Sequence, residues 1–109
     1  MISWSDFEKI EMRIGTITSA APFEKATKPA YKLTIDFGEH GLKNSSAQIT
    51  ALYSLEELTG KQVIAVVNFP PKQIANFFSE CLVLGVYDEN NDVVLLQPGK
   101  EVKNGCRVG

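Results

Sequence analysis

The chain has 109 residues, of which 44% are hydrophobic and 22% charged, so it has the length of one domain (residues 1–109) and the composition of an ordinary globular protein. This composition excludes a disordered chain. Eleven basic and thirteen acidic residues give a net charge of -2, which excludes a histone-like polycation and requires that any contact with nucleic acid come from a local patch.

A short helix from Ser5 to about Ile10 is the first predicted element. Ser5 and Glu8 fit a capping box, because the Ser5 hydroxyl would accept a hydrogen bond from the Glu8 amide while Glu8 reaches back to the Ser5 amide. Phe7 and Ile10, three residues apart, would share one face of this helix, with Trp4 just before the cap. We expect this apolar face to be buried against another surface.

Three strands are predicted next. Residues 13–23 are rich in β-branched side chains, and Gly15 among them indicates a bulge or a bend. Residues 31–37 alternate strictly, which places Tyr31, Leu33, Ile35 and Phe37 on one face. Residues 42–49 follow a turn and have a polar middle, so the second and third strands are expected to form a hairpin.

The second half of the chain predicts one more helix and two more strands. Apolar residues at three- and four-residue spacing indicate a helix over 51–58, ending before Gly60. Residues 62–67 are an apolar run of strand length, and two prolines follow it. Residues 82–87 and 93–96 flank a polar turn, which predicts a hairpin.

Five strands with a helix between the third and the fourth match one known small architecture. This is the partly open, five-stranded Greek-key barrel of the oligonucleotide/oligosaccharide-binding (OB) kind. The predicted fold class is therefore all-β, with short helices outside the barrel.

Groups for catalysis are scarce in this sequence. His40 is the only histidine and stands in a turn, where a solvated residue is expected rather than a base or a metal ligand. Cys81 and Cys106 have no neighbour at zinc-ligand spacing, and the scattered glycines form no phosphate-binding loop. We therefore expect a protein that is not an enzyme, needs no cofactor and binds no metal.

The sequence also indicates a compartment. Its first residues have no apolar core preceded by Lys or Arg, so they do not resemble a secretory signal. The longest apolar runs, 63–67 and 81–86, are far shorter than the roughly 20 residues that cross a bilayer. We expect a cytoplasmic protein without a membrane span, with free thiols and with Cys81 packed as a small core residue.

Groups suited to binding gather around one face of the predicted barrel. Lysines surround the first strand connection, polar side chains occupy the third strand, and phenylalanines bracket the Pro-Pro loop. The expected ligand-binding residues are Arg13, Lys28, Lys32, Lys43, Ser45, Ser46, Gln48, Asn68, Phe69, Lys72, Phe77 and Ser79. For any one lysine, solubility is the better explanation, and the polar groups are equally explained by turn and strand-end capping. Exposed phenylalanines could stack on unpaired bases or hold an extended peptide, and the residues leave both uses open.

Four stretches of the sequence, 6–17, 31–38, 45–50 and 66–71, resemble the tRNA-binding-domain family, which includes the C-terminal domains of many methionyl-tRNA synthetases. The resemblance spans essentially the whole chain. It implies an OB barrel whose N- and C-terminal segments build a symmetric homodimer. The residues expected in that interface are Trp4, Phe7, Pro98, Val102 and Val108.

Two departures from the wider family pattern favour one of its branches. Where the family tends to carry Asn-Leu and Ser-x-Gly-Met, this chain has Asn68-Phe69 and Ser79-Glu80-Cys81-Leu82. These stretches look like a branch of export-related chaperones that bind unfolded precursor proteins and the export ATPase SecA. The resemblance thus implies a non-catalytic chaperone for exported precursors. The alternative is a module that recognises the shape of tRNA through the same lysines and polar groups.

Overall fold

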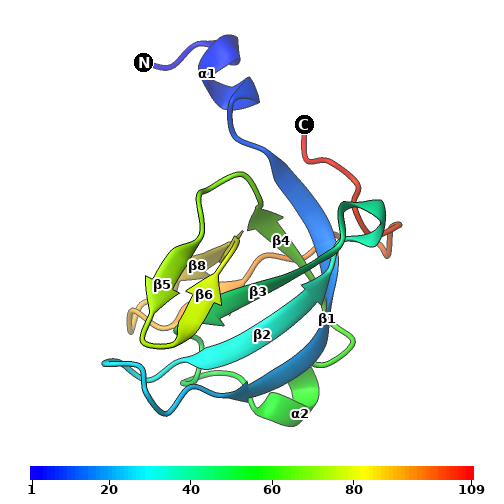
Figure 1. Ribbon diagram of the computed structural model, residues 1–109. Coiled ribbons are helices and arrows are strands. Elements are labelled where there is room, and N and C mark those ends of the chain that lie inside the picture. Colours follow the sequence, from blue (N-terminus) through cyan, green and yellow to red (C-terminus); the bar gives the residue numbers. More distant parts are fainter.

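The computed structural model in Figure 1 describes residues 1–109 and shows a small β-barrel with α1 and both chain ends on one side. Five antiparallel strands form the main sheet, in the order β3-β2-β1-β4-β7, and β5-β6 and β8-β9 are separate two-stranded hairpins. The elements are α1 (Trp4–Glu8), β1 (Met12–Pro22), β2 (Tyr31–Asp36), η1 (Gly38–His40), β3 (Leu42–Ala47), α2 (Leu55–Leu58), β4 (Gln62–Val66), β5 (Lys72–Ile74), β6 (Phe77–Ser79), β7 (Leu82–Val83), β8 (Gly85–Tyr87) and β9 (Val93–Leu95). The all-β OB-type barrel predicted from the sequence is confirmed. None of its helices has the length and apolar character that crossing a membrane would require.

β1 organises the barrel because it changes partners along its length. Its residues 12–16 pair with β4 and its residues 16–22 with β2, with a shift of register between Ile17 and Ser19. The bulge expected at Gly15 thus falls slightly later in the strand. Gly15 has another task, because a Cβ there would lie 2.6 Å from Ile35 and 2.7 Å from Phe37. Only glycine allows these side chains to approach the β1 backbone so closely.

The alternation predicted for β2 is confirmed in the core. Leu33, Ile35 and Phe37 are buried, each with at most 1% of its surface exposed. Tyr31, at the start of the same face, is half-buried, and its hydroxyl donates a hydrogen bond to the Tyr53 carbonyl over 2.8 Å. The hydrophobic interior is therefore filled mainly by alternate residues of the strands, as in other small barrels.

The barrel closes between β3 and the chain just before β7 through one backbone hydrogen bond and one that involves a side chain. The Glu80 amide donates to the Asn44 carbonyl (2.7 Å), and the Asn44 amide donates to the Glu80 carboxylate (2.9 Å). Farther along, β7 stays with β4 and β8 pairs with β9 rather than with β3. The barrel is therefore open between residues 46–49 and 82–85, and we call this opening the seam.

The C-terminal residues complete the sheet beside the first half of β1. The Gly105 amide donates to the Ile14 carbonyl (2.7 Å), the Ile14 amide to the Cys106 carbonyl (2.9 Å) and the Val108 amide to the Met12 carbonyl (2.9 Å). The tail thus pairs with residues 12–14 of β1, on the edge that pairs with β2 farther along the strand.

Helix α1 begins earlier than predicted, because Ser3 and not Ser5 is its cap. The Ser3 hydroxyl accepts from the Asp6 amide (3.1 Å). The Asp6 carboxylate accepts from the Ser3 amide (2.9 Å), and this hydrogen bond lowers the pKa of Asp6. The sequence contains two overlapping capping boxes, and the fold uses the first. α2 is likewise shorter than predicted and starts after its cap, Ser54.

Two features of the second half of the chain were not predicted. The loop after the two prolines contains the hairpin β5-β6, whose turn places Ala75 at a φ of 54°. The single strand predicted over 82–87 is divided at Leu84, whose amide donates to the Ile64 carbonyl while its carbonyl accepts from the Leu96 amide. The chain therefore leaves β4 at this point, and the predicted hairpin with residues 93–96 forms as β8-β9.

Candidate binding surface

A basic and aromatic cluster lies where two loops meet over β2. Phe23, from the β1-β2 connection, and Phe77, from β6, pack edge to face with 5.2 Å between ring centroids. The Lys32 ammonium lies 5.8 Å from the Phe23 centroid and 6.0 Å from the Phe77 centroid. Contact with two rings holds this charge in place, and Lys25 lines the adjoining hollow. Phe77 and Lys32, both predicted binding residues, are thus brought together.

An apolar hollow of about 330 Å³ lies at the base of the β5-β6 hairpin. It is lined by Phe69, Pro70, Lys72, Ser79, Cys81 and Leu82. Phe69 leaves 55% of its surface exposed. An exposed aromatic side chain beside an apolar hollow is typical of a surface that binds apolar groups. Three predicted site residues, Phe69, Lys72 and Ser79, meet at this hollow.

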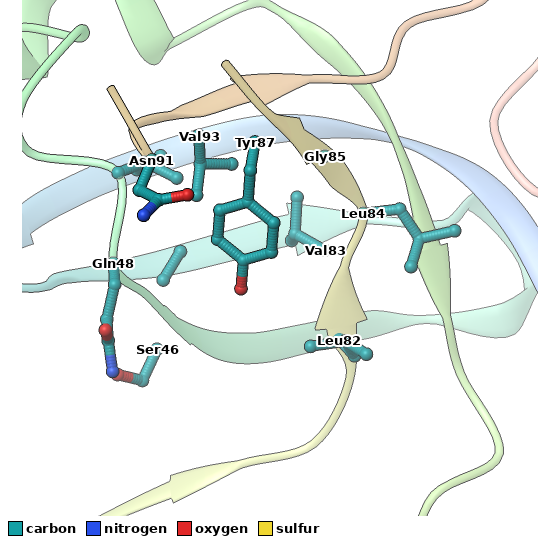
Figure 2. A pocket seen from close by; sticks show the side chains of 11 residues that line it. Ser46, Gln48, Leu82, Val83, Leu84, Gly85, Tyr87, Asn91 and Val93 are labelled. Carbon is teal, nitrogen blue, oxygen red and sulfur yellow. The ribbon is translucent and has the colours of Figure 1, made fainter. Parts of the chain in front are cut away.

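The seam forms a larger groove of about 410 Å³, which begins next to the hollow because Leu82 lines both. Figure 2 shows Tyr87 between Ser46 and Gln48 of one wall and Val83 and Leu84 of the other. Ser46 and Gln48 were predicted as binding residues. None of the residues that line the groove is charged. The groove therefore suits a neutral ligand.

Ser45 was predicted to bind ligand, and the structure corrects this. Only 1% of its surface is exposed, and its hydroxyl donates to the Cys81 carbonyl over 2.9 Å. Ser45 helps to close the barrel instead. Burial raises the pKa of the neighbouring Cys81 thiol to about 11, so this thiol stays protonated at neutral pH.

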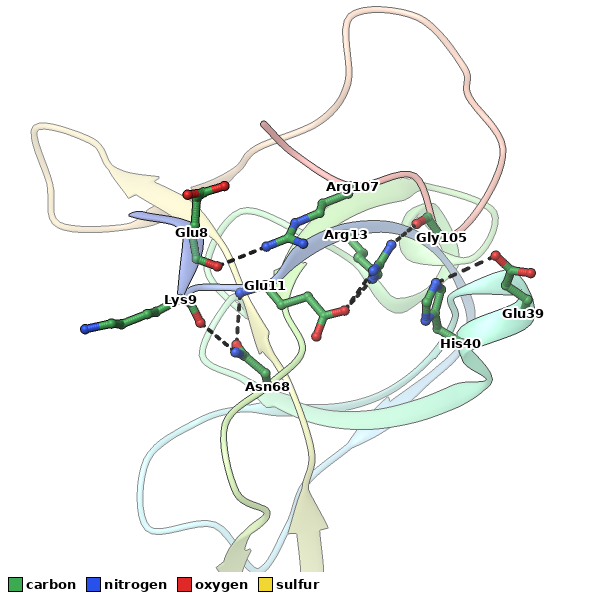
Figure 3. Close-up of polar contacts among 9 residues, drawn as sticks. All are labelled: Glu8, Lys9, Glu11, Arg13, Glu39, His40, Asn68, Gly105 and Arg107. Atoms are coloured by element: carbon green, nitrogen blue, oxygen red, sulfur yellow. Dashed lines mark hydrogen bonds and ion pairs between the residues drawn. The ribbon is translucent and has the colours of Figure 1, made fainter. Parts of the chain in front are cut away.

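Arg13 and Asn68 are engaged in contacts within the protein (Figure 3). The Arg13 guanidinium pairs with the Glu11 carboxylate (2.8 Å) and donates to the Gly105 carbonyl (2.8 Å). The Asn68 side chain accepts from the Glu11 amide (3.0 Å) and donates to the Lys9 carbonyl (2.8 Å). Both side chains therefore fix the segment that joins α1 to the barrel.

The remaining lysines among the predicted binding residues lie apart from these hollows. Lys28 is exposed in the β1-β2 connection, and Lys43 is half-buried on β3, where its charge acts on the Cys81 thiol. No three His, Cys, Asp or Glu side chains come together in a way that could hold a metal ion.

Residues predicted for a dimer interface fall into two groups. Trp4, Phe7 and Val108 line one hollow of about 260 Å³ together with Arg107, whose guanidinium donates to the Glu8 carbonyl (Figure 3). Trp4 leaves 67% of its surface exposed, and no residue of α1 is buried. Pro98 instead lines a polar hollow near Gln62, and the Val102 carbonyl accepts from the Gln62 side chain.

Sequence reasoning missed much of the seam, above all Tyr87, Val93 and Asn91. These residues looked like parts of a hairpin. The available signal was a strand over 82–87 that had to serve two partners, β4 and β9, and so could not also close against β3.

The sequence and the fold match a known protein family. Residues 12–107 match the family described as "Putative tRNA binding domain", so the chain belongs to the tRNA-binding-domain family. Methionine–tRNA ligases of Methanococcoides burtonii and Leptospira biflexa are each 36% identical to it, over 96% and 95% of this chain. The chain spans only 15% of the length of these enzymes.

Within this family, the chain closely resembles proteins known as CsaA. The crystal structure of the chaperone CsaA from Bacillus anthracis is 54% identical, with a TM-score of 0.94 over 100% of this chain and 99% of that one. The CsaA chaperone protein of Picrophilus torridus is 53% identical, also with a TM-score of 0.94, and covers 100% of both chains. A protein of Pyrococcus horikoshii related to methionyl-tRNA synthetase is 29% identical, with a TM-score of 0.88 over 100% of this chain and 98% of that one. The resemblance to the chaperone branch that the sequence indicated is confirmed.

Proposed function

We propose that this protein is a non-catalytic chaperone that binds extended, partly apolar segments of unfolded proteins. The observation that carries the proposal is the apolar hollow beside the exposed Phe69 side chain, which continues into the uncharged seam. Its likeness over the full chain to two structures called CsaA chaperones supports the same function. Following the branch it resembles, we further propose that its clients are precursors of exported proteins, that SecA is a partner, and that it works in the cytoplasm.

We also propose that two copies of the chain associate through α1 and the C-terminal tail. Trp4 and Phe7 stack with 5.3 Å between ring centroids, yet Trp4 remains largely exposed on a helix that buries no side chain. A second copy would cover these rings. Two client sites in one particle would then hold a long unfolded chain by several weak contacts. Sedimentation equilibrium should show a dimer that Trp4→Ala weakens, and a native chain that sediments as a monomer would exclude this arrangement.

Client binding is tested by the fluorescence anisotropy of a labelled, reduced and carboxymethylated protein titrated with this chain at low and high salt. We expect binding that changes little with salt, because the seam has no charged side chain and Lys72 is the one charged residue that lines the hollow. Phe69→Ala should weaken it several-fold. The matched control is Leu42→Ala, which removes another exposed apolar side chain (65% exposed). Leu42 begins β3, whereas the seam lies at the end of that strand. Equal affinities of Phe69→Ala and the unmodified protein would refute the proposal.

A second candidate function is the binding of tRNA, favoured by the grouping of Lys25, Lys28 and Lys32 and by the family to which the chain belongs. Contacts between lysines and phosphates release counterions, so such a complex weakens steeply as salt rises. Adding bulk tRNA to the same titration separates the two functions. Displacement of the client by tRNA, together with steep salt dependence, would favour the RNA module.

A further inference from the structure

The β3 edge that borders the seam carries peptide groups without partners. Both the amide and the carbonyl of Asn44 bond to Glu80, so the peptide groups of Asn44 face away from β2. Peptide groups of alternate residues in a strand point to the same side, and the Ser46 amide does so, since it donates to the Ser79 hydroxyl over 3.1 Å. By the same alternation, the Ser46 carbonyl and both peptide groups of Gln48 face the seam. Neither the amide nor the carbonyl of Gln48 takes part in any hydrogen bond within the protein.

The opposite wall of the seam repeats this arrangement. The Leu84 amide donates to the Ile64 carbonyl of β4, and Ala65 lies opposite Val83 in the register. The peptide groups of Val83 therefore point away from β4, toward the seam. Two strand edges with hydrogen-bonding groups thus face the same groove.

The groups that line the groove favour a polypeptide over a nucleic acid as its ligand. Its walls offer peptide donors and acceptors at strand spacing, its lining includes Ala47, Ile49, Val83 and Val93, and it has no charged side chain. A polypeptide backbone matches this pattern, because it offers neutral N–H and C=O groups at the same spacing. A phosphate backbone does not match it, since no cation lines the groove to neutralise the phosphates.

We propose that an extended client segment adds to the free edge of β3 as a further strand and occupies the seam. This inference rests on the proposed function, because it presumes a polypeptide client, and it specifies how the client binds. Side chains of the added strand would alternate between the apolar lining and solvent. The preferred clients are therefore segments in which small or β-branched apolar residues alternate with polar ones.

The test uses a fluorescein-labelled ten-residue peptide in which valine and threonine alternate, together with a set of copies that each carry one N-methylated peptide bond. Each N-methyl group removes one donor. We expect methylation at every second central position to weaken binding about three- to tenfold, the effect of losing one hydrogen bond. Methylation at the positions between should have a smaller effect, because on the opposite wall the peptide groups that point toward the seam are those of Val83. If the loss of affinity does not alternate along the peptide, strand addition is refuted. Because only the peptide is changed in this test, the protein cannot fail to fold.

A pair of variants tests the edge from the protein side. Gln48→Pro removes the free amide, whereas its matched control Gln48→Ala keeps it and loses only the exposed side chain. Gln48→Pro should weaken peptide binding about three- to tenfold more than Gln48→Ala, with thermal melts verifying that both are folded. Equal binding by the two variants contradicts strand addition. Binding of the carboxymethylated protein without any binding of the peptide also refutes strand addition while the chaperone function stands. Loss of binding to both ligands in the unmodified protein refutes the function itself.

Discussion

Two adjacent serines on β3, Ser45 and Ser46, should differ in how much their replacement by alanine lowers the stability of the protein. Ser45 is buried and donates to the Cys81 carbonyl over 2.9 Å, which ties β3 to the chain before β7. The Ser46 hydroxyl instead lines the seam, and its contact with Ser79 is made by the amide, which alanine keeps. Ser45→Ala therefore tests the closure of the barrel, and Ser46→Ala is its control.

The size of the effect follows from the Cys81 carbonyl. Without the Ser45 hydroxyl, this acceptor keeps only a long contact of 3.4 Å with the Ser79 hydroxyl. Leaving a buried acceptor nearly unpaired costs about 1–2 kcal/mol of the free energy of unfolding. Unfolding entropy is about 2.1 cal/mol/K per residue, so for 109 residues each kcal/mol lowers the melting temperature by about 4 °C.

We therefore expect the Ser45→Ala variant to melt about 4–9 °C below the unmodified protein, and Ser46→Ala to melt within about 2 °C of it. Circular dichroism melts and urea titrations at constant pH measure the stability of both variants. Ser46→Ala should also alter client affinity, because its hydroxyl lies in the groove. If the Ser45→Ala variant has the same melting temperature as the unmodified protein, this hydrogen bond does not hold the barrel closed.

Three other predictions concern Ala75 and the two cysteines. Ala75→Gly should raise the free energy of unfolding by about 0.5–1 kcal/mol in urea titrations, because Ala75 has a φ of 54° and glycine adopts this conformation without strain; an unchanged or lower value would contradict this. Iodoacetamide at pH 8 should modify the exposed Cys106 and spare the buried Cys81, which peptide mass spectrometry resolves. Between pH 9 and 11 the Cys81 thiol ionises in the unfolded chain but keeps its proton in the folded one, so the free energy of unfolding should fall by up to about 3 kcal/mol as the pH rises. A Cys81→Ala variant with the same pH profile would rule this out.

The sequence predicted the barrel well wherever one face of a strand is buried. β2 shows this most clearly, since its alternate apolar residues could belong only to a half-buried strand. The burial of Ser45 was also within reach of the sequence. Ser45 shares its parity with Ala47 and Ile49, which are both buried, so period two places it inside despite its hydroxyl. The error came from treating the polar middle of the strand as a single outward face.

Other features depend on contacts that no local pattern encodes. The β5-β6 hairpin follows two prolines and turns at Ala75 rather than at a glycine, so its turn lacks the usual residues. The capping box that begins at Ser5 ends in Glu8, the usual residue there, yet the fold uses the box that begins at Ser3 and ends in Asp6, so local sequence does not select the cap. The seam arises because the strand over 82–87 changes partners at Leu84, which is a property of the whole sheet.

The pairing of the tail with β1 has a consequence for how the chain folds as it is made. The bond between Gly105 and Ile14 joins residues far apart in the sequence, so the edge of β1 cannot be covered until residue 105 has left the ribosome. Pairings this distant in sequence form slowly, and an uncovered strand edge is open to association with other chains. While it is being synthesised, this protein therefore exposes the kind of unpaired strand that we propose it binds in its clients.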